Sequence, residues 1–143
     1  MELTENQDRD KLIAKVESNF SILIRRFRRD INEVHGNVIS AQEYLFLSCL
    51  SKHEPETASG LAKQFDVSPS YTTIVVDKLI RNGWVDRRRS QTDRRIVELT
   101  MTADGTGMVE KIGAIRREFM HQMFDPISDE ELSELVQLTH KLI

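Results

Sequence analysis

Residues 57–85 read TASGLAKQFDVSPSYTTIVVDKLIRNGWV, and this stretch decides the fold. Ser68 followed by Pro69 is a strong helix-start signal, because serine caps free backbone N–H groups and proline has the backbone angle of the first helical position. The helix should end at Asn82-Gly83, and a shorter helix should precede it. The tight turn at Asp66-Val67 would set the two helices at a large angle, which is the pattern of a helix-turn-helix.

Two short extended segments follow, Trp84 to Arg89 and Arg94 to Met101. Apolar and polar side chains alternate in the second segment, as in a half-buried strand, so we expect a β-hairpin. Residues 78–95 hold seven basic side chains against two acidic ones, whereas the formal net charge of the chain is −3. A basic stripe on an otherwise acidic chain favours a polyanionic partner.

Helices are also predicted on both sides of this centre. Apolar residues at spacings of three and four predict a long helix over residues 10–35, and Ser40 with Glu43 forms a capping box that opens the next helix. Thr102 is placed to cap a helix after the hairpin, and a second capping box at Ser128 opens a last one. The predicted fold class is therefore mainly α with a small β-hairpin wing.

The expected organisation is a single domain over residues 1–143. Its centre, residues 40–101, would be a winged helix-turn-helix core, and residues 10–35 and 103–143 would be dimerisation helices. Such long apolar stripes exceed what one small core can cover, so we expect an α-helical homodimer. Its two recognition helices would lie about one DNA turn apart, roughly 34 to 36 Å.

The composition excludes several other classes of protein. Charged residues make up 30% and hydrophobic residues 39% of the 143 residues, with a single cysteine, which excludes a disulfide framework and a wholly disordered chain. No apolar run approaches the roughly 20 residues of a membrane span, and the acidic start of the chain does not fit a signal peptide. We therefore expect a cytoplasmic protein with no membrane partner.

The chain resembles the MarR-type winged-helix repressors. The resemblance rests on residues 57–85, on the DRRRSQTDRR segment that follows them and on the MTADG segment that begins at Met101. Its most specific parts are the Asp-x-Arg motif of Asp93 and Arg95 and the seven-residue step from Arg95 to Thr102. The family implies a homodimer that binds pseudo-palindromic promoter DNA, with a small-molecule effector that often releases it.

The expected DNA contacts lie on the second helix of the helix-turn-helix and on the hairpin. On that helix the candidate residues would face outward, and the residues that would pack inward are Thr72, Val75, Val76 and Leu79. Hydroxyl and basic side chains suit phosphates and base edges, and an arginine suits a narrow minor groove. Asp93 would hold Arg95 in an extended rotamer without touching DNA itself. Ile74 stands where the family commonly has a polar or basic residue, and it could either pack on a thymine methyl or belong to the core. The candidate DNA-binding residues are Ser68, Ser70, Tyr71, Thr73, Ile74, Lys78, Arg87, Arg88, Arg94 and Arg95.

An effector pocket would lie where the dimerisation helices meet the winged core. Its candidate walls are Phe27, Ile31, His35, Tyr44 and Phe46, although aromatic residues at helical spacing also fit plain core. Some members of the family that the chain resembles sense peroxides through a cysteine near the start of the first helix. Cys49 lies midway along the second predicted helix of the chain, which favours a buried thiol over a redox sensor. The histidines are scattered and Cys49 with His53 gives too few ligands, so we expect no metal and no cofactor.

No catalytic motif competes with this interpretation, and an enzyme is not expected. The chain has no glycine-rich phosphate loop, no paired histidine motif and no nucleophile elbow. The alternative is a winged-helix module for protein–protein contact without DNA binding. Such modules usually lack a basic wing, which favours the DNA-binding transcriptional regulator, with repression as the expected mode.

Overall fold

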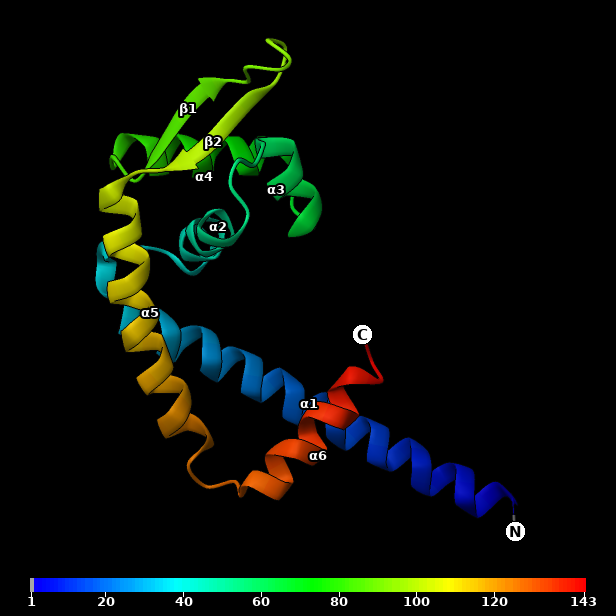
Figure 1. Ribbon diagram of the computed structural model, residues 1–143. Coiled ribbons are helices and arrows are strands. Elements are labelled where there is room, and N and C mark those ends of the chain that lie inside the picture. The colour runs from blue at the N-terminus through cyan, green and yellow to red at the C-terminus, as the bar shows by residue number, and fades with distance from the viewer. Residues whose placement is uncertain (1) are drawn as a thin grey trace. The chain divides into compact units, whose positions relative to one another are not determined.

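The computed structural model describes residues 2–143, and the side chains of residues 7–143. The chain divides into two compact units, one that ends at Ala41 and one that runs from Gln42 to Ile143. The elements, drawn in Figure 1, are α1 (Glu2–His35), a short 3-10 helix η1 (Gly36–Val38), α2 (Ala41–Lys52), α3 (Ala58–Gln64), α4 (Pro69–Arg81), β1 (Val85–Arg89), β2 (Val97–Met101), α5 (Ala103–Phe124) and α6 (Asp129–His140).

The first unit consists of α1 and the segment after it. The helix begins well before residue 10, where the apolar pattern starts, and ends at His35 as predicted. Gly36 then takes a left-handed backbone conformation with φ of 53°, which glycine adopts without strain. Seven large apolar side chains along α1 remain 43–65% exposed: Leu12, Ile13, Val16, Phe20, Ile22, Leu23 and Ile24. This face is unusually apolar for a surface in contact with water.

The second unit has its core between α2, α3, α4 and the hairpin. Phe46 and Phe65 pack with ring centroids 5.4 Å apart, and Val76 and Leu79 of α4 are completely buried. The helices begin where their caps predict, since Thr57, Ser68, Thr102 and Ser128 each accept a hydrogen bond from a backbone N–H three residues ahead. At Ser128 the capping box is complete, because the Ser128 N–H donates a hydrogen bond to the Glu131 carboxylate.

The turn between α3 and α4 is tight. Asp66 lies in the left-handed region with φ of 50°, and the Val67 N–H donates to the Ala62 carbonyl at 3.0 Å. Together with the cap at Ser68, this turn makes α3 and α4 the predicted helix-turn-helix, with α4 lying beneath the hairpin (Figure 1). The fold is thus mainly helical with a two-stranded wing, as predicted.

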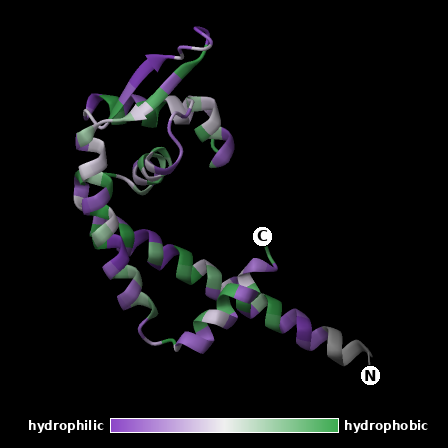
Figure 2. Ribbon diagram, in the orientation of Figure 1, coloured by the Kyte–Doolittle hydropathy of each residue, from purple (hydrophilic) through white to green (hydrophobic). Residues whose placement is uncertain are grey.

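The wing is a two-stranded antiparallel sheet in which Val85 lies opposite Met101 and Arg89 opposite Val97. Glu56 adds a single bridge to the other edge of β2 at Leu99. Figure 2 shows β1 mainly hydrophilic and β2 mainly hydrophobic. The sequence predicts that the second strand starts at Arg94, but β2 begins only at Val97 because residues 90–96 form a hydrogen-bonded turn.

Candidate nucleic-acid interface

Helix α4 presents one buried face and one exposed face. The four residues predicted to point inward are buried: Thr72, Val75, Val76 and Leu79. The six predicted to point outward are exposed: Ser68, Ser70, Tyr71, Thr73, Ile74 and Lys78. The period of 3.6 residues therefore assigned every one of these side chains to the correct face.

Several hydroxyl groups of α4 are engaged by the helix itself. The Ser68 oxygen accepts from the Tyr71 N–H at 3.2 Å, and it lies 3.3 Å from the Ser70 hydroxyl. Thr72 donates to the Ser68 carbonyl and Thr73 donates to the Pro69 carbonyl, each at 3.0 Å. The bonds of Ser68 and Thr73 reduce the hydrogen-bonding capacity that the exposed face offers to a ligand.

Three of the basic residues are paired with carboxylates. Lys78 Nζ lies 2.7 Å from an oxygen of Glu43, whose side chain is buried on α2. Arg87 of β1 forms an ion pair with Asp77 of α4, which links the wing to that helix.

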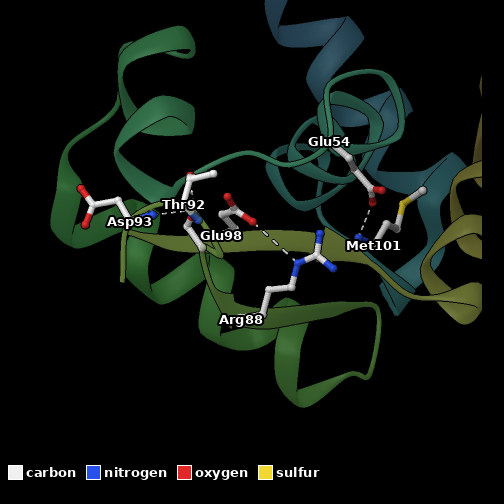
Figure 3. A network of polar contacts seen from close by, with 7 residues as sticks. Glu54, Arg88, Thr92, Asp93, Glu98 and Met101 are labelled. Carbon is white, nitrogen blue, oxygen red and sulfur yellow. Dashed lines mark hydrogen bonds and ion pairs between the residues drawn. The ribbon is translucent and has the colours of Figure 1, made fainter. Parts of the chain in front are cut away.

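Arg88 is paired across the hairpin. Its Nε lies 3.6 Å from Glu98 on β2, directly opposite in the strand register (Figure 3). None of these carboxylate partners was predicted from the sequence. Only the pairing of Arg88 with Glu98 could have been read from the hairpin register.

The tip of the wing is built around Ser90, which is buried. Its hydroxyl oxygen accepts from the backbone N–H groups of Thr92 and Asp93 at 3.3 and 3.4 Å. Asp93 in turn accepts from the backbone N–H of Arg95 at 3.0 Å. This bond of Asp93 shapes the backbone of the tip, whereas the sequence predicted that Asp93 orients the guanidinium of Arg95.

The tip carries two arginines that are neighbours in the sequence, Arg94 and Arg95. Arg94 and Arg95 are both exposed, and the carbonyl of Arg94 accepts a bond from Arg89 Nη1 at 3.2 Å. In the part of the chain that the structure describes, neither guanidinium forms an ion pair within 4.0 Å, unlike those of Arg87 and Arg88. A phosphate group would find these two cations free of a competing carboxylate.

A cavity of about 710 Å³ lies between α5, α6 and Tyr44 of α2. Arg116 lies over the Tyr44 ring, 4.6 Å from its centroid, and burial lowers the pKa of this guanidinium from its ordinary value. The lining residues are Tyr44, Gly113, Arg116, Arg117, Met120, His121, Phe124, Asp125, Ile127, Asp129 and Leu132.

The structure places the five predicted pocket residues in different surroundings. Tyr44 lines the cavity, but Phe46 is fully buried in the core against Phe65 and is not on its wall. Phe27, Ile31 and His35 belong to α1, in the other unit. The sequence pattern missed the α5 and α6 residues, whose arginines and apolar side chains are typical of ordinary amphipathic helices.

Cys49 is buried and its thiol lies 3.2 Å from the Gln64 side-chain oxygen. Burial raises the pKa of the Cys49 thiol above its ordinary value, and the Glu56 carboxylate adds to this shift. Both effects disfavour the reactive thiolate. Among the side chains that the structure describes, no group of three or more His, Cys, Asp and Glu residues could hold a metal ion. No helix in that part of the chain is long and apolar enough to cross a membrane.

An exposed helix after a tight turn, beside a basic hairpin, is the arrangement of winged helix-turn-helix DNA-binding proteins. The MarR family model matches residues 39–97. The chain is 30% identical over 134 residues to the uncharacterised transcriptional regulator YpoP of Bacillus subtilis, covering 94% of this chain and 95% of that protein. It is 24% identical to the transcriptional repressor MdtR of the same species, covering 93% and 86%.

Solved structures show the same fold. The transcriptional regulator BldR from Sulfolobus solfataricus superposes with a TM-score of 0.75 at 26% identity, covering 90% of this chain and 94% of that one. A mutant MarR from Escherichia coli complexed with operator DNA superposes with a TM-score of 0.74 at 20% identity, covering 87% and 94%. The chain belongs to the MarR family of DNA-binding transcriptional regulators, which are not enzymes.

Proposed function

We propose that this regulator acts as a homodimeric repressor on pseudo-palindromic promoter DNA. Helix α4 would enter the major groove, and the wing tip with Arg94 and Arg95 would reach the adjacent minor groove or its phosphates. The observation that carries this proposal is the pair of exposed arginines, without an ion-pair partner among the described residues, on the hydrogen-bonded wing tip, together with the exposed face of α4. The relative MdtR, which is named a repressor, supports the direction of regulation.

The homodimer is supported by apolar surface in both units. The exposed face of α1 is one part of it. In the other unit α6 is described without any buried residue, and Leu135, Val136, Leu138 and Leu142 are 38–74% exposed. A second copy of the chain would cover these faces, and its α4 would supply the second half-site contact of a palindrome.

Release of DNA by a small-molecule effector is the third part of the proposal. It is supported by the cavity between α5 and α6, whose volume of about 710 Å³ falls in the range of small-molecule sites. Its wall combines apolar side chains such as Phe124 with the cations of Arg116 and Arg117. Ligand binding there would act on the helix that leaves the wing, because α5 begins directly after β2.

The decisive experiment is a gel shift with DNA from upstream of the gene, measured from about 50 to about 300 mM salt. We expect one specific fragment to be retained, with affinity that falls steeply as salt rises. Replacing Arg94 and Arg95 together by alanine should weaken binding and lower the slope of log K against log salt by about 3 to 4, because a dimer has two wings and each phosphate contact contributes about 0.9.

The matched control removes two charges elsewhere. Lys11 and Lys15 are exposed on α1, and replacing both by alanine should leave the salt slope unchanged. No retention of any fragment at low salt would contradict the proposal. It would favour a winged-helix module for protein contact, for which a partner complex insensitive to salt is the expected finding.

A further inference from the structure

The most exposed apolar side chain on α4 is that of Ile74. It is 65% exposed, and Tyr71 beside it is 44% exposed. Ser70 lies one turn before Ile74, and Asp77 and Lys78 lie one turn after it on the same face. Ile74 is therefore part of the surface that would meet base edges, and the core interpretation of this residue is wrong.

Three polar side chains near Ile74 each make a contact within the protein. The Thr73 hydroxyl donates its hydrogen to the Pro69 carbonyl at 3.0 Å. Asp77 is held by Arg87 of the wing, and Lys78 Nζ lies 2.7 Å from the buried Glu43. Each of these contacts takes up part of the hydrogen-bonding capacity of the group, so a bond from the engaged atom to a base would be an exchange of partners.

Contact between DNA and the apolar side chain of Ile74 does not compete with any hydrogen bond inside the protein. In the major groove the C5-methyl group of thymine is the apolar feature that a side chain of this kind can recognise. Burying one methyl-sized group against another apolar group changes affinity by about fourfold. That is a modest but measurable discrimination, and it occurs once in each half-site of a palindrome.

We propose that α4 selects its operator through contact between Ile74 and the C5-methyl group of one thymine in each half-site. This inference rests on the proposed function, since it assumes that α4 enters the major groove. It assigns Ile74 as a specificity-determining residue and predicts a thymine that cannot be exchanged for an unmethylated pyrimidine without loss of affinity.

The test starts from double-stranded DNA with a randomised 20-base-pair centre, selected on the wild-type protein and sequenced. The selected DNA is then synthesised with uracil in place of each thymine in turn, which removes only the methyl group. We expect one position per half-site where this change weakens wild-type binding about fourfold, and about fifteenfold when both half-sites are changed.

Two variants locate the contact. Ile74→Ala should bind the thymine and uracil DNAs equally well, and below wild type on the thymine DNA. Ile96→Ala removes a comparable exposed side chain from the wing tip, where Ile96 is 41% exposed, and should keep the full difference between the two DNAs. Because both residues are exposed, circular dichroism should show both variants folded as wild type.

The outcomes separate the two hypotheses. If selection enriches a sequence but no uracil position changes wild-type affinity, or if Ile74→Ala stays sensitive to uracil, this inference is wrong and the proposed function stands. If no sequence is enriched, the proposed function fails and the inference fails with it.

Discussion

The joint between the wing and α5 depends on Gly105. This residue is in the first turn of α5, and its N–H donates to the Thr102 hydroxyl oxygen at 3.0 Å. A Cβ added there would collide with the Trp84 carbonyl oxygen, and would lie 2.7 Å from Met101 Cγ and 3.1 Å from the Trp84 carbonyl carbon. Since the nearest atom belongs to the backbone of Trp84, a rotation of the Met101 side chain cannot relieve the collision.

The expected cost of Gly105→Ala follows from this geometry. Overpacking of a closed site costs about 1 to 3 kcal/mol. Moving the Trp84 carbonyl also strains its hydrogen bond from the Thr102 N–H, now 3.0 Å, which contributes about 1 kcal/mol. The higher helix propensity of alanine offsets up to about 1 kcal/mol of this destabilisation. We therefore expect the free energy of unfolding to fall by about 2 kcal/mol.

The assay is urea unfolding followed by circular dichroism at one fixed protein concentration, since unfolding of a dimer depends on concentration. A loss of about 2 kcal/mol lowers the urea midpoint by about 1 M for a chain of this size. Gly107→Ala is the matched control on the same helix, because a Cβ there meets nothing within 4 Å. It should stabilise the protein by about 0.5 to 1 kcal/mol.

The comparison of the two alanine variants is decisive. If Gly105→Ala is as stable as Gly107→Ala, the close approach between α5 and Trp84 does not exclude a side chain at position 105, and the reasoning is refuted. If both variants are destabilised equally, the effect belongs to α5 in general and not to the joint.

Two further predictions concern the thiol and the dimer. Burial raises the pKa of the Cys49 thiol, so iodoacetamide should alkylate the folded protein far more slowly than the unfolded chain, and equal alkylation rates would contradict this. The free energy of unfolding should fall as pH rises above about 8.5, because the thiol of the unfolded chain loses its proton first. Leu23 is 47% exposed on α1, and Leu23→Glu should sediment as a monomer at about micromolar concentration where wild type sediments as a dimer; a wild-type monomer would refute the proposed assembly.

The helix boundaries were predictable because their signals are local. Thr57, Ser68 and Thr102 each bond to an N–H three residues ahead, so the cap and its partner lie in the same short stretch of sequence. The same holds for the faces of α4, where Ile74 and Val75 point to opposite environments as the helical period requires.

The wing was predicted less completely. The alternation of apolar and polar residues from Val97 to Met101 identified β2, but the predicted strand began too early, at Arg94. The turn at the tip depends on the buried Ser90 hydroxyl and the Asp93 carboxylate, which bind several backbone N–H groups at once. Such shared bonds are set by the folded loop and not by residue type alone.

The sequence by itself determined the order of the elements, the exposed face of α4 and the basic character of the wing, because each follows from periodicity, capping or charge within a short segment. Only the tertiary structure decided which basic side chains have no carboxylate partner and can therefore bind DNA phosphates. Glu43 and Lys78 come from different helices, and Asp77 of α4 meets Arg87 of β1. A local pattern does not contain the distance between elements, and that distance decides whether a cation faces a carboxylate of its own chain or is left for DNA.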